Sequence, residues 1–301
     1  MTFFSRIRPY IIWYALLVCI VISIVLWKVV LHEERHGILT FAVLDIGQGD
    51  SLFIESPTGK QVLVDGGPNK TLMKAISKVL PWYDRHIDIM VVTNPDLDHY
   101  SGFIPFLNKY KVDFDIEPGT NSPTETYAYL EKEIADKNIQ KIIAHRGEKI
   151  DLGGGAYLEI LFPDRDVSGL TSNDGSLVMK LVYGETSVML QGDSTAKIED
   201  YLLTLGTTTL KSTILKAGHH GSKTSSTLEY VSAVSPQWTV ISSGVNNDYG
   251  HPHKETLETM SKLKIPALDT CNNGTIIFKS DGKIFSLQNK NPKSAEVGCK
   301  S

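Results

Sequence analysis

The chain has little cysteine, no surplus of positive charge and no internal repeat. Only 3 of its 301 residues are cysteine, which excludes a small domain held together by a disulfide framework. The formal net charge is −4, and the first 32 residues hold three of the 30 basic residues and none of the 34 acidic ones. The remainder is therefore mildly acidic, so a contact with nucleic acid would need a local basic patch. The length suits one large domain or two small ones.

One long apolar run stands near the amino terminus. From Ile11 to Trp27 only Ser23 interrupts it. About 20 such residues in a helix cross the ~30 Å hydrocarbon core of a bilayer, whereas the apolar part of a signal peptide is usually only about 7–15 residues long. We predict an uncleaved transmembrane anchor over residues 10–31, preceded by a cytoplasmic amino terminus at 1–9. A buried core helix is the alternative, and an apolar surface on every face disfavours it.

The orientation of this span and the state of the cysteines are less strongly encoded. Two arginines precede the span, while Lys28 and Arg35 lie near its far end, so the positive-inside signal is nearly balanced. Retention of the short basic amino terminus in the cytoplasm is the simpler outcome and places the body outside it. Cys271 and Cys299 either pair in an oxidising compartment or stay free.

After a short polar linker at 32–37, the sequence predicts a single α/β domain over 38–288 and a flexible polar tail over 289–301. Strands are expected at 39–46, 51–55, 61–64, 87–92, 139–144, 157–162, 176–183, 187–191, 213–216, 239–242, 275–279 and 283–287. Helices are expected at about 69–79, 102–110, 124–137, 196–205 and 256–263, with a further one before the strand at 239–242.

The loop after the strand at 87–92 concentrates polar donors. Asn94, Asp96, Asp98 and His99 follow an apolar run directly, and Pro95 prevents a helix from starting among them. Such a loop either aims ligands at one metal ion or is simply a helix-capping turn.

Similar polar groups follow four other apolar runs. They are Asp65, Asp193, the pair His219 and His220, and His251. Loops at the carboxyl ends of strands are free to carry polar groups, and ligands of sheet-based enzymes gather there. Any one of these groups suits an ordinary turn. Five together favour a shared metal-binding pocket.

These residues also carry a resemblance. The chain resembles the metallo-β-lactamase-fold hydrolases, and closely the soluble carboxyl-terminal domain of ComEC-type DNA-uptake proteins, over roughly residues 38–288. The matching strings are LDIGQGDS (44–51), VLVDGG (62–67), TNPDLDHYSG (93–102), NDGSLVMKL (173–181), LQGDS (190–194), LKAGHHGSKTSS (215–226) and NNDYGHP (246–252). The resemblance implies a four-layer αββα sandwich, here preceded by a single transmembrane helix.

The resemblance further implies two divalent metal ions, Zn²⁺ or Mn²⁺, bridged by Asp193. The ligands carried over to the first ion are Asp96, Asp193 and His219, and those carried over to the second are Asp98, His99, Asp193 and His251. Asp65 would orient a ligating histidine from behind. The resemblance places His220 and Tyr249 toward the substrate as proton or hydrogen-bond donors, and it leaves open which histidine of the pair touches metal.

Asn94 departs from the family pattern, which has histidine at this position. Its neutral carbonyl oxygen is a weak ligand, so the first site is expected to be oxygen-rich and to hold its ion weakly or not at all. Asp98 and Asp193 remain to fix the second ion and orient the attacking water.

Three functions stay open at this stage. The first is a membrane-anchored phosphodiesterase or nuclease that acts on DNA outside the cytoplasm by metal-activated water, working with a separate membrane channel protein. The second is a hydrolase of a small phosphodiester or phosphocholine-type ester. The third is a non-catalytic module with a degenerate metal site. Lys211, Lys216 and Lys223 flank the histidine pair and either form the basic patch that DNA needs or lie on a solvated face.

Overall fold

The computed structural model describes residues 4–33 and 36–299 and divides into two units, Met1–His36 and Gly37–Ser301. Those parts of the expected amino terminus, linker and tail that fall at 1–3, 34–35 and 300–301 lie outside the described residues. The first unit is one helix, α1 (Phe4–Glu33). Among the described residues, one helix is long and apolar enough to cross a membrane, over Tyr10–Trp27. The predicted apolar helix is therefore confirmed, and its insertion into a membrane stays a prediction.

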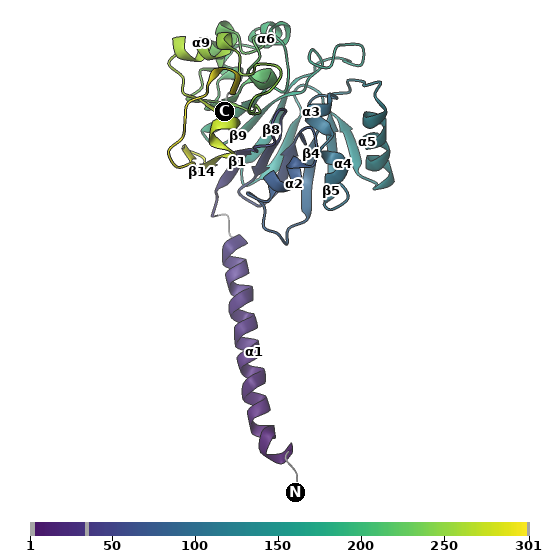
Figure 1. Cartoon of the computed structure of the whole chain (residues 1–301), viewed down its shortest axis with the longest axis vertical. Coiled ribbons are helices and arrows are strands. Elements are labelled where there is room, and N and C mark those ends of the chain that lie inside the picture. Colours follow the sequence, from purple (N-terminus) through teal and green to yellow (C-terminus); the bar gives the residue numbers. More distant parts are fainter. Residues whose placement is uncertain (1–3, 34–35, 300–301) are drawn as a thin grey trace. The chain divides into compact units, whose positions relative to one another are not determined.

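The second unit is built on two sheets (Figure 1). The first has the strand order β15-β14-β1-β2-β3-β4-β5-β6 and the second the order β13-β12-β11-β10-β9-β8-β7. The strands of the first sheet are β1 (Leu39–Val43), β2 (Leu52–Glu55), β3 (Gln61–Val64), β4 (His86–Val91), β5 (Lys111–Glu117), β6 (Gln140–Ile143), β14 (Ile276–Ser280) and β15 (Phe285–Leu287). Those of the second are β7 (Lys149–Gly153), β8 (Ala156–Phe162), β9 (Val178–Tyr183), β10 (Thr186–Leu190), β11 (Ile214–Lys216), β12 (Trp238–Ile241) and β13 (Ala267–Asp269).

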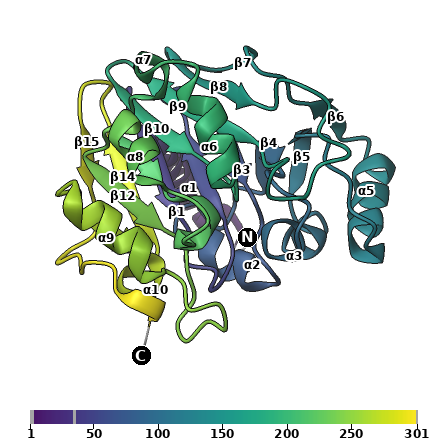
Figure 2. The ribbon, with the colours of Figure 1, turned by 90° about the horizontal axis from the view of Figure 1, so that it is seen from above.

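Helices cover the outer faces of the two sheets, as Figures 1 and 2 show. They are α2 (Thr71–Ile76), α3 (Leu97–Tyr100), α4 (Phe103–Phe106), α5 (Glu125–Asp136), α6 (Ala196–Leu203), α7 (Thr207–Leu210), α8 (Leu228–Val234), α9 (Lys254–Lys262) and α10 (Thr270–Asn273), with short 3₁₀ turns η1 (Gly218–Gly221) and η2 (Val297–Cys299). Helices α2 to α5 lie on the first sheet and α6, α8 and α9 on the second.

The alternation of buried residues along the strands explains this layering. In β1, Phe41 and Val43 point between the two sheets, while Ala42 points toward the helices. A strand presents successive side chains to opposite faces, so a strand that is apolar throughout must be covered on both. Each such side chain contributes about 1.5–3 kcal/mol when fully buried. The predicted four-layer αββα sandwich is confirmed.

Parallel pairing brings the chemistry to one edge. Strands β3 to β6 are parallel to one another, and so are β10 to β13. The carboxyl ends of β3, β4, β10 and β11 carry Asp65, the 92–99 loop, Asp193 and η1. Donors that lie far apart in the sequence therefore meet at the same end of the sandwich.

Three strands escaped the sequence analysis: β5, β7 and β13. The clearest case is β5, which carries Lys111, Asp113, Asp115 and Glu117 at alternate positions. These charges hide the apolar face of a strand that has neighbours on both sides.

The expected flexible tail is also not observed, as far as residues 289–299 are described. A disulfide joins Cys271 to Cys299, with the Cα atoms 6.0 Å apart. The backbone N–H of Ala295 donates to Ala267 O at 2.8 Å, and that of Gly298 donates to Pro252 O at 3.0 Å. The polar composition of this segment concealed the covalent bond and backbone contacts that hold it.

Candidate metal centre

Glycines let the loops of the site pack against one another. A Cβ on Gly49 would lie 2.3 Å from the backbone oxygen of Asp98, so only glycine fits there. The next residue, Asp50, donates its backbone N–H to the same oxygen at 3.2 Å, and Gly66 donates to His99 O at 2.5 Å. The three loops that follow β1, β3 and β4 are thereby fixed relative to one another.

Three side chains of the site sit on a left-handed backbone. The φ angles are +59° at Asp65, +48° at His219 and +54° at His220. This region is sparsely populated by residues other than glycine and costs of order 1–3 kcal/mol per residue, and such strain concentrates at functional sites. In η1 it turns two consecutive imidazoles into the same pocket.

Asp65 and His99 form the first carboxylate–imidazole couple. His99 Nδ1 lies 2.9 Å from Asp65 Oδ2, and both side chains are fully buried. Thr93 anchors the carboxylate by donating its backbone N–H to Oδ1 at 2.8 Å and its hydroxyl to Oδ2 at 2.6 Å. The couple fixes the imidazole so that His99 Nε2 faces Asp193 Oδ2 at 3.1 Å. Asp65 thus lies where the sequence placed an orienting residue.

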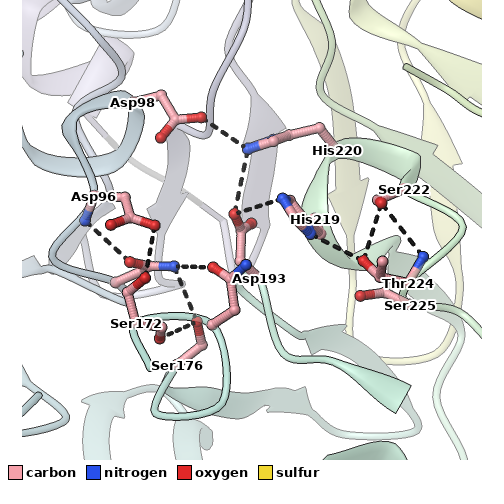
Figure 3. A network of polar contacts seen from close by, with 12 residues as sticks. Asp96, Asp98, Ser172, Ser176, Asp193, His219, His220, Ser222, Thr224 and Ser225 are labelled. Atoms are coloured by element: carbon pink, nitrogen blue, oxygen red, sulfur yellow. Dashed lines mark hydrogen bonds and ion pairs between the residues drawn. The ribbon is translucent and has the colours of Figure 1, made fainter. Parts of the chain in front are cut away.

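A second couple, which the sequence analysis missed, joins Asp50 to His220. His220 Nδ1 lies 3.1 Å from Asp50 Oδ1, and its Nε2 lies 3.2 Å from Asp98 Oδ2 and 3.6 Å from Asp193 Oδ2. Figure 3 shows Asp98 and Asp193 turned toward this imidazole. The available signal was the string Gly47-Gln48-Gly49-Asp50, a carboxylate framed by glycines just after a strand.

Lys216 completes this second couple. Its ammonium group lies 2.8 Å from Asp50, and the lysine side chain is 0% exposed. The sequence analysis placed Lys216 in a surface patch for DNA, and that interpretation is wrong. The last residue of the short, fully buried strand β11 points inward, and its charge is compensated by a carboxylate 166 positions away.

The buried charges perturb one another strongly. Burial lowers the pKa of His220, but Asp193 and Asp50 outweigh it and raise that pKa to about 10. Burial likewise opposes a positive charge on His99, yet Asp193 and Asp65 hold its pKa well above the usual range. Burial alone would raise the pKa of Asp193, and the imidazolium groups of His99 and His220 lower it below its usual range. The pocket thus pairs negative and positive groups at very short range.

Several buried atoms of this cluster are left unpaired. His99 Nε2, His220 Nε2 and Asp193 Oδ1 have no hydrogen-bond partner among the described residues. Ligand atoms of Asp98, His99 and His220 lie within 4.8 Å of one another, as do those of Asp50, His99 and Asp193. Two imidazole nitrogens and two carboxylates are a donor set that divalent Zn²⁺ or Mn²⁺ accepts. The residues present therefore fit the metal that the sequence predicts.

The two neighbouring histidines exchange their expected roles. His220, expected to face substrate, is buried with its Nε2 among the carboxylates. His219, expected to bind metal, is 26% exposed, and its Nε2 lies 3.7 Å from Asp193 Oδ2. Its Nδ1 is 3.1 Å from the hydroxyl of Thr224. His219 therefore stands at the rim, where a substrate arrives.

His251 and Tyr249 line the same rim. A cavity of about 340 Å³ opens over the cluster, and its wall includes both residues, His219 and Gln48. Tyr249 is exposed and stacks on the ring of His251 at 5.6 Å between centroids. His251 Nδ1 lies 3.3 Å from the side-chain amide of Gln48. Burial and the neighbouring His220 and His219 lower the pKa of His251 to about 3, so its imidazole is neutral.

The expected first metal site is occupied by internal hydrogen bonds. Asn94 donates its side-chain amide to Asn173 Oδ1 at 3.0 Å and to Ser176 Oγ at 3.3 Å, and its Oδ1 accepts the backbone N–H of Asp96 at 3.0 Å. Asp96 in turn accepts the hydroxyl of Ser172 at 2.8 Å. The amide oxygen of Asn94 is thus turned to the backbone.

Fold and donor set together define a metallo-hydrolase of the αββα class. The model of the Metallo-beta-lactamase superfamily matches residues 44–244, and the chain belongs to that superfamily. Within it, the chain is similar to ComE operon protein 3 of Bacillus subtilis (27% identity over 80% of this chain and 33% of the relative). It is also similar to Recombination protein 2 of Haemophilus influenzae (30% identity, 77% of this chain, 28% of the relative).

A third relative is Competence protein ComA of Neisseria gonorrhoeae, with 28% identity over 78% of this chain and 31% of the relative. The chain thus spans about a third of the length of these relatives. A diphosphatase of the PhnP family overlaps 67% of this chain and 85% of its own length, with 14% identity and a TM-score of 0.41. The resemblance to ComEC-type competence proteins is confirmed.

Proposed function

We propose that this chain is a membrane-anchored, metal-dependent phosphodiesterase that cleaves DNA outside the cytoplasm. One observation carries the catalytic part of the proposal. Two buried imidazoles, each backed by a carboxylate, leave Nε2 atoms without a hydrogen-bond partner among the described residues, and both atoms face Asp193. Unpaired buried polar atoms are costly unless a ligand completes them.

Asp98, His99, Asp193 and His220 would hold a divalent ion. When bound, such an ion supplies a water nucleophile that is ionised near neutral pH and a Lewis acid for a phosphoryl oxygen. Asp65 and Asp50 keep the two imidazoles in the tautomer that presents Nε2. Because Asn94 and Asp96 are engaged in hydrogen bonds of their own, a second ion at the first site would be held weakly.

The rim residues are placed to act on the substrate. His219 is partly exposed beside Asp193, so its imidazole would donate a proton to the leaving oxygen. The Tyr249 hydroxyl stands at the mouth of the cavity and would donate a hydrogen bond to a phosphate oxygen. These roles differ from the sequence prediction, which gave the proton donor as His220.

The names of the relatives and the disulfide support the choice of substrate and compartment. Two relatives are named as competence or recombination proteins, which favours DNA. The Cys271–Cys299 disulfide is typical of a domain outside the reducing cytoplasm. The anchor over residues 10–31 would keep the enzyme beside a separate membrane channel protein that takes up the DNA.

The test is degradation of end-labelled single-stranded DNA by the detergent-solubilised full chain with Mn²⁺ or Zn²⁺. We expect cleavage that is abolished by chelation and by Asp193→Asn, and retained by the matched exposed variant Asp166→Asn. Intact DNA under both ions would overturn the proposal.

The size of the cavity favours one second candidate, a small phosphodiester or phosphocholine-type ester. About 340 Å³ accommodates a single small substrate, and the burial of Lys216 removes one of three lysines from the expected patch. Hydrolysis of bis(p-nitrophenyl) phosphate without DNA cleavage would select this candidate. Metal-free protein with no turnover of either substrate would instead select a non-catalytic module.

A further inference from the structure

The edge of the sandwich opposite the metal centre carries its own surface chemistry. We call it the basal edge, the side at which the parallel strands β3 to β6 begin. Strand β1 is antiparallel to β2, and β2 to β3, so β1 also begins there. The folded domain starts just before β1 at Gly37, whose backbone oxygen accepts the Tyr183 hydroxyl at 2.6 Å. The chain therefore enters the domain at the basal edge.

Large apolar side chains project from this edge. Trp82 is 82% exposed and Tyr83 is 42% exposed, in the loop that leads into β4. Ile284 is 67% exposed, in the turn between β14 and β15. This turn lies beside the start of the domain, because Glu185 N donates to Gly282 O at 2.6 Å just after Tyr183. Exposed tryptophan and tyrosine are the residues that favour the interface between lipid and water.

A basic pocket lies on the same edge, next to the aromatic loop. Its volume is about 430 Å³, and its lining includes Lys109, Lys111 and Lys137. Lys111 opens β5 and donates its backbone N–H to the oxygen of Arg85 at 2.9 Å, three residues after Trp82. Lys111 pairs with Asp113 at 3.3 Å and Lys137 pairs with Glu133 at 3.4 Å, both at the surface.

The acidic groups nearest the aromatic loop are already engaged. Asp84 accepts the side-chain amide of Gln61 at 2.7 Å, and Asp88 accepts the backbone N–H of the same residue at 2.7 Å. The lysines of the pocket therefore dominate the chemistry offered to an anion here. A phosphate headgroup fits both the charge and the size of this pocket.

We propose that the basal edge seats on the surface of an anionic lipid bilayer, with Trp82, Tyr83 and Ile284 among the headgroups and the lysine pocket on a lipid phosphate. Residues 28–36 are all that separates the apolar span ending at Trp27 from the start of the domain, a reach of at most roughly 25 Å. The metal centre, at the opposite edge, then faces away from the lipid. This inference rests on the membrane anchor of the proposed function and is independent of its catalytic part.

The chain contains four tryptophans, which allow a direct test. Full-length variants that keep only one of them, the others being changed to phenylalanine, are reconstituted into nanodiscs containing acyl-brominated lipid. We expect Trp82 to lose much of its fluorescence in phosphatidylglycerol and less in phosphatidylcholine. A matched control moves the single tryptophan to the opposite edge by Tyr249→Trp, and its fluorescence should be unchanged.

Two further variants separate the possible failures. The Trp13-only protein reports insertion of the anchor, so its quenching together with unquenched Trp82 would overturn the seating alone. Unquenched Trp13 would overturn both the anchor and the seating. Changing Lys109, Lys111 and Lys137 together to glutamine should remove the difference between the two lipids. A difference that persists would overturn the role of the pocket.

Discussion

The ammonium group of Lys216 lies 2.8 Å from the carboxylate of Asp50, with both side chains buried beneath His220. The taking of two charges out of water is costly unless they compensate each other. Here the pair also serves a purpose, because the carboxylate is the acceptor that orients the imidazole. The metal centre is thus supported from below by a charged layer that no solvent reaches.

Removal of the lysine charge should destabilise the domain strongly. Lys216→Met leaves Asp50 buried with less compensation, which costs about 3–5 kcal/mol. Urea unfolding of the solubilised chain measures this loss. The exposed Lys211→Met is the matched control and should change stability by less than about 0.5 kcal/mol. Equal effects of the two variants would show that the buried pair has no special weight.

Asp65→Asn should weaken metal binding without removing a ligand. The amide cannot accept the Nδ1 proton of His99 as strongly, so the imidazole is less well held and less basic. Loss of such an orienting partner usually costs about 10–100-fold in metal affinity. Titration calorimetry with Zn²⁺ measures the effect directly. Unchanged affinity would exclude an orienting role for this carboxylate.

Asn94→His tests the state of the first site. The native protein should bind one ion tightly, because Asn94 is used to hold the loop together. The variant should raise the metal content toward two ions and lower stability by about 1–3 kcal/mol, since buried partners lose their hydrogen bonds. Elemental analysis after dialysis gives the stoichiometry. Two tightly bound ions in the native protein would contradict this account.

A pH dependence is expected from Asp115, which lies away from the metal centre. Burial and then the neighbouring Glu117 raise its pKa well above the usual value, and neither carboxylate oxygen has a hydrogen-bond partner among the described residues. The folded state therefore holds a proton that the unfolded state has already lost. The stability from this proton is present below about pH 4 and is lost as the pH rises through the folded-state pKa.

The variant Asp115→Asn removes this dependence. It should be more stable than the native chain at pH 8 and equally stable near pH 3.5, each pKa unit being worth about 1.4 kcal/mol. Thermal unfolding across this pH range is the measurement, with the exposed Asp166→Asn as control. A constant difference at all pH values would show that Asp115 does not titrate in this way.

The disulfide should matter for stability and for the active-site rim. It closes a loop with a sequence separation of 28 residues, and its removal costs about 3 kcal/mol in the chain-entropy model. The backbone N–H of Asn246 donates to Cys299 O, which ties the carboxyl-terminal segment to the loop carrying Tyr249. Cys271→Ser with Cys299→Ser should therefore lower the melting temperature and raise the KM for substrate. A variant with unchanged values would show that backbone contacts alone hold the segment.

Much of the fold follows from patterns within short stretches. The strand at 61–64 with Asp65 at its end is readable because apolar residues must be buried and polar ones collect where a strand stops. The same logic failed for β5, whose alternate charges resemble a surface loop. It failed again for residues 289–299, because a disulfide between distant cysteines leaves no local signature.

The sequence by itself determined the apolar helix, the αββα class and the chemical types of the metal donors, since each depends on residues close together in the chain. Only the tertiary structure decided that His220 rather than His219 enters the donor cluster. The same is true of the burial of Lys216 against Asp50. These are contacts between residues up to 170 positions apart. Local sequence cannot encode which way a side chain turns when the answer depends on what the rest of the chain places beside it.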